Sequence, residues 1–418
     1  MDNDIDLLDI FDYQYAKYKH KFLHRPVDIS HYNKRINQYN ILINIPITKM
    51  KHYKKEYVAK GGQGTIYFMY VTYKEHIFKI SIKFVRLEDY LMKKNNYKNT
   101  YYKKWRELDI LQKCTKYVKN KITQNLPLNY HSRVYKDSSN KNPYNKLATY
   151  NEAADGNMLH WLEKPHNSME WKSFLFQIWH AVYVLQKKLK LAHNDLRLPN
   201  ILYFDVKQGG YWKYIMENTA YYVPNEGSVF IIWDFGSAES TMYPTKHDQK
   251  YIVTTKLKSN RDLHFIHDLY NRVRILVMLN KYTMDELVDI LSKTKEDREI
   301  IDKEREINKK RYRQYPHRFE EKFKIAMIYY IIETNRYDEL YQNRIDKEID
   351  PDKIYHLPPD DIMKILKDLS ENYNCSYKDA ITKGVPKECK VIPSPLILIN
   401  KFLPEFQKEH STLIEFRI

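Results

Sequence analysis

Three of the nine glycines in this 418-residue chain fall within four positions, at Gly61, Gly62 and Gly64. The runs on either side, "YVAK" and "TIYFMYVTY", are rich in β-branched and aromatic residues, which favour strands. A chain that otherwise avoids glycine has therefore placed it between two expected strands. Glycine there permits a tight turn and lets amide N–H groups approach an anion closely. An ordinary hairpin turn is the alternative, and the glycines alone do not exclude it.

The composition indicates a folded protein with an excess of positive charge. Apolar residues make up 43% of the chain, enough to fill a substantial core, and the net charge is +17. Such a surface would attract an acidic partner or nucleic acid, although the lysines are spread along the whole chain. The three cysteines, Cys114, Cys375 and Cys389, have no paired spacing, which argues against a disulfide scaffold or a zinc site.

The sequence contains no transmembrane segment or secretory signal by its hydrophobic pattern. The first residues, "MDNDIDLLDIFDY", are acidic and lack the basic start and apolar run of a signal peptide. The longest apolar run, "IAMIYYII" at 325–332, is too short to cross a bilayer. We therefore expect a protein that acts inside the cell, in a reducing compartment.

Hydrophobic patterning predicts further strands and two helices after the glycines. The run "IFKISIKFV" reads as another strand, and residues 101–119 place bulky apolar side chains at helical spacing. The segment "KLATYNEAADGNM" reads as a strand that runs out into a linker. Residues 168–190 predict a buried helix, because apolar residues recur with helical period between a Ser start and a basic end.

The segment after this helix predicts a loop followed by strands. Residues 193–200 read "HNDLRLPN", and Pro199 excludes a helix interior there. Two β-like runs, "ILYF" and "SVFIIWDF", flank an insert at 205–227. The chain beyond residue 262 is expected to be largely helical, and residues 1–50 show no clear periodicity before "YNILINIPI".

Charged residues occur on the expected strand and helix. Lys79 and Lys83 are four residues apart and therefore point to the same face of the strand. Glu107 lies on a partly apolar face of the helix, where an acid needs a partner, and a strand lysine would supply one. Pairing with Lys103 on the same helix is the alternative, and a strand lysine is more often a surface residue.

Polar oxygen ligands follow in the loops. Asp195 and Asn200 lie in "HNDLRLPN", and Asp234 lies in "WDFG" directly after an apolar strand. Carboxylate and amide oxygens suit Mg²⁺, which usually keeps waters and substrate phosphates in its shell. Each feature alone has an ordinary explanation, so the functional prediction rests on the order in which they occur along the chain. The order is a glycine turn, a strand lysine, a helix glutamate, a loop aspartate with an asparagine five residues later, and Asp-Phe-Gly.

This order resembles the protein kinase family over roughly residues 56–280. The resemblance implies an α+β, bilobal kinase-like fold with a small β-rich N-lobe, which carries one main helix, and a large, mainly helical C-lobe. The implied boundaries are an N-terminal extension at 1–50, the N-lobe at 51–152 and the C-lobe core at 153–300. A helical part at 301–418 would complete the C-lobe or extend it.

The resemblance also implies an ATP site. The stretch "AKGGQGTIY" looks like the loop over the ATP phosphates, with Ala59 in place of its first glycine. Lys83, in "SIK", is preferred to Lys79 as the ATP lysine, with Glu107 as its partner. "TYNEAADGNM" looks like the hinge that offers backbone groups to adenine. The implied nucleotide-binding residues are Ala59, Gly61, Gly62, Gly64, Ile66, Lys83, Glu152, Ala154 and Leu202.

The loop at 193–200 looks like the catalytic loop. Asp195 would accept or orient the proton of the attacking hydroxyl. Arg197 stands where kinases acting on Ser/Thr usually carry a lysine, and would contact the γ-phosphate. The implied catalytic residues are Asp195, Arg197, Lys83 and Glu107, and the implied ligands of Mg²⁺, or of Mn²⁺ in its place, are Asn200 and Asp234.

The sequence also departs from the family pattern. Asn194 replaces the arginine that often ties to a phosphorylated activation loop, so activation by loop phosphorylation is not expected, although threonines are present at 241, 245, 254 and 255. No Ala-Pro-Glu motif closes the activation segment, and the insert at 205–227 separates Asp195 from Asp234. "RDLHFIHDL" at 261–269 resembles a helix start in kinases of large cytoplasmic DNA viruses. The poxvirus virion kinases look similar in their altered first glycine and missing arginine.

The resemblance implies an ATP-dependent kinase that phosphorylates Ser/Thr hydroxyls of a protein substrate, in the host cytoplasm and the virion. Two alternatives stay open. Kinase-like small-molecule phosphotransferases have a similar His-x-Asp loop with an Asn five residues after the Asp. A catalytically inactive kinase fold that serves as a basic binding module is the other, although every expected catalytic and metal position is filled.

Overall fold

The structure is a computed structural model of the chain. It describes residues 30–45, 51–61, 64–73, 76–137, 144–243, 354–373, 392–410 and 414–417, with scattered positions from 253 to 323 that include the helix α9 (Lys295–Arg311). Gly62, the apolar run at 325–332 and residues 1–29 lie outside this described part. None of the helices within it is long and apolar enough to cross a membrane.

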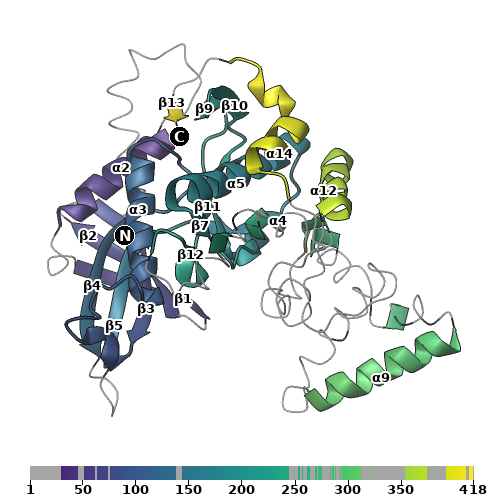
Figure 1. The fold of residues 1–418 in the computed structure, drawn as a ribbon, viewed down its shortest axis with the longest axis horizontal. Helices are drawn as coiled ribbons and strands as arrows, with labels where there is room; N and C mark the ends of the chain where they lie inside the picture. The colour runs from purple at the N-terminus through teal and green to yellow at the C-terminus, as the bar shows by residue number, and fades with distance from the viewer. Residues whose placement is uncertain are drawn as a thin grey trace, which may run out of the picture.

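An antiparallel five-stranded sheet forms the N-terminal half (Figure 1). Its strands, in spatial order, are β1 (Lys51–Gly61), β2 (Gly64–Tyr73), β3 (His76–Leu87), β5 (Tyr144–Glu152) and β4 (Asn129–Asp137). The strands predicted around the glycines and at "IFKISIKFV" are therefore confirmed. Gly61 pairs with Gly64 where β1 turns into β2. A Cβ at Gly64 would lie 2.5 Å from the carbonyl oxygen of Phe84, so β2 can approach β3 this closely only with glycine there.

One long helix, α3 (Lys103–Lys119), packs beside this sheet. Its apolar face is predicted by helical spacing, and the side chains on that face are buried. They include Trp105 and Leu108, which contact Leu87 on β3 and Leu147 on β5. The contacts fix the direction of α3 relative to β3, and they thereby set where the polar side chains of both elements meet.

The helix α5 (Ser168–Leu189) forms the centre of the C-terminal half. Asn167 caps its first turn in a capping box with Glu170. The helix therefore begins at Ser168, the predicted start signal, and its cap is the residue before it. The remaining elements are β6 (Gly156–Asn157), α4 (Met158–Leu162), β7 (Leu191–Ala192), β8 (Ile201–Asp205), β9 (Tyr211–Met216), β10 (Thr219–Pro224), β11 (Ser228–Ile232), β12 (Glu239–Ser240), α12 (Asp360–Tyr373), α14 (Pro395–Phe402) and β13 (Ile414–Arg417).

The C-terminal half is less helical than expected in the described residues, because several strands form there as well. The insert at 205–227 folds as the β9–β10 hairpin, and β13 adds a parallel strand beside β9. The physical reason is the alternation along β9, where every second side chain is buried. Glu217 turns the hairpin with a positive φ of 55°. The N-terminal antiparallel sheet with its helix is confirmed, and the whole is an α+β fold.

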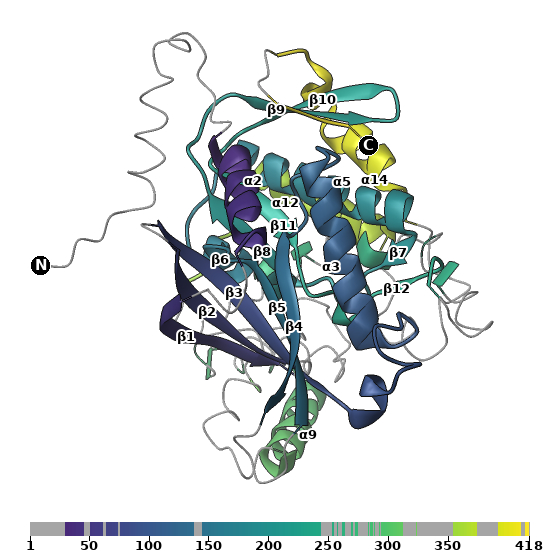
Figure 2. The same cartoon turned by 90° about the vertical axis from the view of Figure 1, so that its left-hand side faces the viewer.

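A helix that the sequence does not predict, α2 (Ser30–Ile43), lies between the five-stranded sheet and the C-terminal half (Figure 2). The hydroxyl of Tyr32 donates to the carbonyl oxygen of Val118, at the end of α3, over 2.7 Å. The same ring packs edge-on against Phe416 of β13, with centroids 5.5 Å apart. Part of the expected extension at 1–50 is thus built into the core rather than laid upon it.

We expect removal of the Phe416 ring to loosen the junction of β13, α2 and the insert hairpin. Phe416 is fully buried and also stacks on Tyr214 of β9. Phe416→Ala should lower the free energy of unfolding by about 3–5 kcal/mol, as for other buried rings. Urea denaturation measures the loss. Arg417→Ala, one residue along the same strand and exposed, is the control and should cost within about 1 kcal/mol. Equal losses in the two variants would contradict this account of the junction.

Candidate active site

Lys83 is the centre of a buried charge cluster. Its ammonium Nζ lies 2.6 Å from Oε1 of Glu107 on α3 and 2.7 Å from Oδ1 of Asp234, just after β11. The Lys83 side chain is 4% exposed. Lys79 lies elsewhere, with its ammonium over the ring of Phe68. The structure thus brings three predicted residues together from three elements, and it pairs Glu107 with Lys83.

The electrostatics of this cluster keep Lys83 and Asp234 charged. Burial alone would lower the pKa of Lys83, but the nearby carboxylates of Glu107 and Asp234 outweigh burial and raise it. Burial would likewise raise the pKa of Asp234, yet the Lys83 ammonium holds it below the ordinary value for aspartate. Lys83 and Asp234 therefore stay ionised across the neutral pH range.

The backbone at Asp234 is held in an unusual conformation. Its φ of 64° and ψ of 76° lie in the left-handed region, which few residues other than glycine adopt readily. Oδ1 of Asp234 accepts the N–H of Gly236 over 3.4 Å. Phe235 is buried and packs edge-on against the ring of His193. These contacts turn the Asp234 carboxylate toward Lys83.

The loop at 193–200 is tied to the end of β11 by two hydrogen bonds. The N–H of Trp233 donates to the carbonyl oxygen of Asn200 over 2.8 Å. Nε2 of His193 lies 2.9 Å from the carbonyl oxygen of Trp233, and the N–H of Asp195 lies 3.3 Å from Nδ1 of His193. The imidazole thus donates through Nε2 and accepts through Nδ1. The loop that carries Asp195 and the segment that carries Asp234 are held as one unit.

Asp262 also holds this loop, although the sequence patterns assign it no role. Its two carboxylate oxygens accept the N–H groups of His193 and Asn194, over 2.8 and 3.0 Å. It is buried in a short turn, Arg261–Leu263. The signal that could have found it is the aspartate in "RDLHF", within the stretch that is similar to viral kinases. Carboxylates that accept backbone N–H groups fix a loop strongly.

Asn194 makes a second tie within the site. Its φ is 64°, and asparagine tolerates this left-handed backbone better than most residues. Its side-chain amide donates to the carbonyl oxygen of Ser237 over 3.0 Å and to Oε2 of Glu239 over 3.1 Å. Asn194 therefore binds the segment after Asp234 with an uncharged group.

Two further loop residues, Asn200 and Arg197, lie beside the carboxylate of Asp195. The side-chain nitrogen of Asn200 donates to the carbonyl oxygen of Asp195 over 2.7 Å and to its Oδ2 over 3.2 Å. Nε of Arg197 lies 3.6 Å from Oδ1 of Asp195. The resemblance assigns Arg197 to a phosphate, and the structure places it beside the candidate base.

The donors fit a magnesium ion bound together with phosphates. Because the amide nitrogen of Asn200 is used within the loop, its amide oxygen is the atom suited to a cation, and Asp234 offers a carboxylate. The described residues hold no group of three or more His, Cys, Asp or Glu side chains that could hold a metal ion. A site here would complete its shell with phosphate oxygens and water, as is usual for Mg²⁺.

Among the predicted nucleotide-binding residues, Ile66 lies beside Lys83, and the others lie on or next to other strands. Ile66 pairs with Lys83 across β2 and β3, so the two side chains share a face. Ala154 packs with Phe204 and Ile231, and Leu202 contacts the same group. Ala59 and Gly61 are on β1, and Gly62 lies outside the described residues.

Glu152 differs from the expected arrangement. It is predicted to offer a backbone group, but its N–H already donates to the carbonyl oxygen of Leu128, so a contact with a base would use its carbonyl. Its carboxylate is buried and bound by Arg35 of α2. No periodic or spacing signal in residues 1–50 points to this arginine.

The chain is similar to two iridovirus proteins whose names describe them as serine/threonine-protein kinases. The resemblance to kinases of large DNA viruses predicts this similarity. It is 27% identical over 224 residues to the "Probable serine/threonine-protein kinase 380R" of Invertebrate iridescent virus 6, which is 50% of this chain and 41% of that protein. It is 39% identical over 66 residues to the "Putative serine/threonine-protein kinase 019R" of Frog virus 3 (isolate Goorha), 15% of this chain and 8% of that protein. The chain thus aligns with less than half the length of either relative. No protein-family model matches the chain.

Lys83→Met should unbalance the charge cluster, because it leaves the carboxylates of Glu107 and Asp234 without their ammonium. We expect a loss of about 3 kcal/mol in the free energy of unfolding at neutral pH. The pKa of Asp234 is depressed in the folded parent, so its contribution is present above its ordinary pKa and is lost as the pH falls through the folded value. The gap between parent and variant should therefore shrink in acid.

Urea denaturation at neutral pH and at about pH 2.5 measures this gap, since the contribution of Asp234 is lost only below the ordinary aspartate pKa of about 4. Lys79→Met is the matched control, because it removes a lysine from the same strand whose ammonium lies over an aromatic ring. A gap of the same size at both pH values would contradict the assignment of the cluster.

Proposed function

We propose that this chain is an ATP-dependent protein kinase that transfers the γ-phosphoryl group of Mg-ATP to Ser/Thr hydroxyls of a protein. The observation that carries the proposal is the Lys83 cluster, in which a strand, a helix and a post-strand loop each supply one charged group. The tied loop at 193–200 beside it adds the acid Asp195. The iridovirus relatives support the same function and a bilobal kinase-like fold.

Lys83 would bind the α- and β-phosphates, with Glu107 holding its ammonium in place. Its raised pKa keeps the positive charge that this task needs. Asp234 contacts Lys83, so its carboxylate would lie close to phosphates bound by that ammonium. A magnesium ion bound by Asp234 and Asn200 would supply neutralisation of phosphate charge when present.

Asp195 would orient the attacking hydroxyl and accept its proton. The Asn200 amide and the Arg197 guanidinium hold the Asp195 carboxylate from two sides, so its direction is set before a substrate arrives. Arg197 would also contact the γ-phosphoryl group during transfer. Because the transition state is loose and anionic, positioning and charge neutralisation do most of the work.

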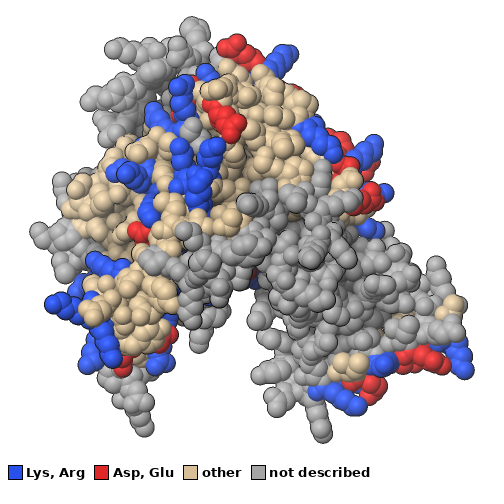
Figure 3. Space-filling model, in the orientation of Figure 1, with Lys and Arg blue, Asp and Glu red and all other residues tan. Residues whose placement is uncertain are grey.

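A protein substrate is part of this proposal, and the names of the viral relatives support it. Action in the host cytoplasm and the virion is a further part of the proposal. The inactive binding module is the rival function with an observation of its own. Figure 3 shows Lys and Arg side chains gathered over the region of α2 and α3, a surface that would attract an acidic partner or nucleic acid. Salt-sensitive DNA binding without phosphotransfer would favour that rival.

We further propose that the enzyme needs no phosphate on its activation segment. Asn194 already binds the carbonyl oxygen of Ser237 and the carboxylate of Glu239, and neither contact involves a phosphorylated residue. An arginine at this position would instead gain from a negatively charged partner.

Asp234→Asn should abolish phosphotransfer while leaving the fold intact, because asparagine keeps the left-handed backbone but loses the charge. Asp195→Asn should lower turnover by about 10²–10⁴-fold, the range for a lost general base. The measurement is ³²P transfer from Mg-ATP to the protein itself and to casein, with phosphoamino-acid analysis.

Asp302→Asn is the control, since Asp302 is exposed on α9. Equal ³²P transfer by Asp234→Asn and the parent would overturn the site. Transfer to an aminoglycoside or choline, and not to protein, would instead identify a small-molecule phosphotransferase.

Phosphatase treatment of the purified protein should leave its turnover unchanged, because the Asn194 contacts carry no phosphate. Asn194→Ala should lower turnover with or without phosphatase, since it removes both contacts from the segment after Asp234. Steady-state rates before and after treatment test this. Loss of activity on phosphatase treatment of the parent would show that a phosphate is required.

A further inference from the structure

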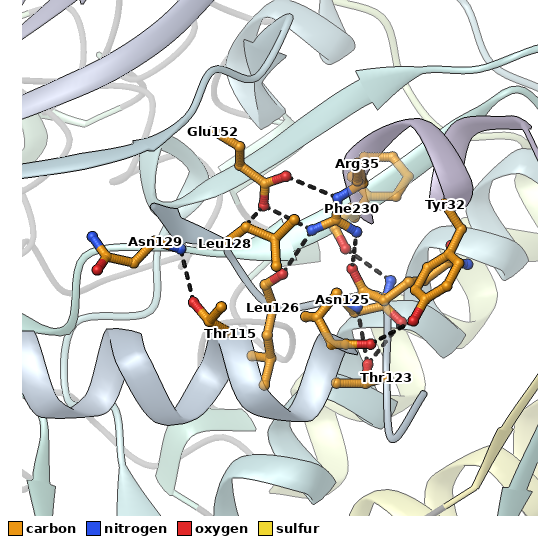
Figure 4. Close-up of polar contacts among 12 residues, drawn as sticks. Tyr32, Arg35, Thr115, Thr123, Asn125, Leu126, Leu128, Asn129, Glu152 and Phe230 are labelled. Carbon is orange, nitrogen blue, oxygen red and sulfur yellow. Dashed lines mark hydrogen bonds and ion pairs between the residues drawn. The ribbon is translucent and has the colours of Figure 1, made fainter. Parts of the chain in front are cut away.

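Arg35 makes an unusually complete set of contacts for a residue in an N-terminal helix. Its guanidinium binds Glu152 in a fork, from Nε to Oε2 over 2.8 Å and from Nη2 to Oε1 over 2.7 Å (Figure 4). Nη1 donates to the carbonyl oxygen of Gln124 over 2.6 Å, and Nη2 donates to that of Leu126 over 2.8 Å. The Arg35 and Glu152 side chains are each 4% exposed.

The partners of Arg35 lie on or next to elements that carry predicted site residues. Glu152 is the last residue of β5, and Ala154 follows two residues later. Gln124 and Leu126 lie in the connection between α3, which carries Glu107, and β4. The guanidinium carbon also lies 5.3 Å from the ring centre of Phe204 on β8, the strand that carries Leu202.

The connection between α3 and β4, which Arg35 binds, is itself hydrogen-bonded to the end of β11. The side-chain amide of its Asn125 donates to the carbonyl oxygen of Phe230 over 2.8 Å (Figure 4). The backbone carbonyl oxygen of Asn125 accepts the N–H of Ile232 over 3.3 Å. Asp234 comes two residues after Ile232. Oε1 of Glu152 also accepts the N–H of Leu128 over 2.8 Å, so both ends of the connection are fixed.

Stability alone does not explain such a buried pair. Burying two charges is costly, and apolar side chains of similar volume usually stabilise a core as well or better. A planar guanidinium with several fixed donors instead sets the relative positions of its acceptors. Here those acceptors are two backbone carbonyls of the α3–β4 connection and the carboxylate of Glu152 in the expected hinge.

We propose that Arg35 is a positioning residue for the nucleotide, and that α2 belongs to the ATP-binding unit. Arg35 holds Glu152 so that the Glu152 carbonyl and the Ala154 N–H are set for the adenine edge before ATP binds. Preset groups bind more tightly because less conformational freedom is lost on binding. This inference rests on the proposed kinase function.

The test compares variants of the full chain by nucleotide binding and by kinetics. Arg35→Gln should raise the Kd for Mg-ATP and the KM for ATP by about tenfold, which corresponds to about 1.4 kcal/mol. The kcat at saturating ATP should change little, because no group that meets the reacting atoms is altered. Arg35→Lys keeps the charge but not the fork, and it should not restore the affinity.

Leu398→Ala is the control for lost stability. Leu398 is fully buried on α14, which packs on α5 and not on the candidate site. It should lower the free energy of unfolding by about 2–5 kcal/mol and leave the KM for ATP as in the parent. If Arg35→Gln does not fold, Arg35→Met/Glu152→Met replaces it, because that pair leaves no buried charge unpaired. The double variant should fold and bind Mg-ATP weakly.

The outcomes separate this inference from the proposed function. If the parent and the Arg35 variants bind Mg-ATP equally well, the positioning role is wrong. The proposed kinase function would be unaffected by that result. The positioning role is likewise overturned if the double variant folds and keeps the parental KM for ATP. A parent that neither binds nor uses Mg-ATP contradicts the proposed function, and the inference fails with it.

Discussion

The buried ammonium of Lys83 sets the main constraint on this fold. A charge that is 4% exposed needs partners, and the chain supplies two carboxylates that lie 24 and 151 residues away. Glu107 requires α3 to lie against β3, and Asp234 requires β11 to end beside both. The two halves of the molecule therefore meet at this charge cluster. Because the carboxylates of Glu107 and Asp234 both contact the Lys83 ammonium, they must lie close to each other.

A second buried cation, Arg35, solves the same problem differently. Lys83 is a point charge held by carboxylates alone, whereas Arg35 spreads its charge over one carboxylate and two backbone carbonyls. The first arrangement concentrates the charge at one atom, which suits the phosphate contact proposed for Lys83. The second pairs the charge with several fixed acceptors, which suits the positioning role proposed for Arg35.

The features that sequence reasoning finds are those with a local pattern. The helices α3 and α5 repeat apolar residues with helical period, and the strands around the glycines are rich in β-branched residues. The helix α2 escapes prediction because it buries tyrosines and an arginine, which make no apolar stripe. The Arg35–Glu152 pair joins residues 117 positions apart, and a single sequence offers no signal for it. The β9–β10 hairpin was missed although its alternation is readable.

The parallel pairing of β13 with β9 has a consequence for how the chain matures. Residues 414–417 complete a sheet whose other strands were synthesised about two hundred residues earlier, and the N–H of Arg417 also binds the carbonyl oxygen of Lys121. On the ribosome, the hairpin and the end of α3 lack their β13 contacts until residues 414–417 emerge. Chaperone protection of the nascent chain is therefore most needed between the synthesis of β9 and that of β13.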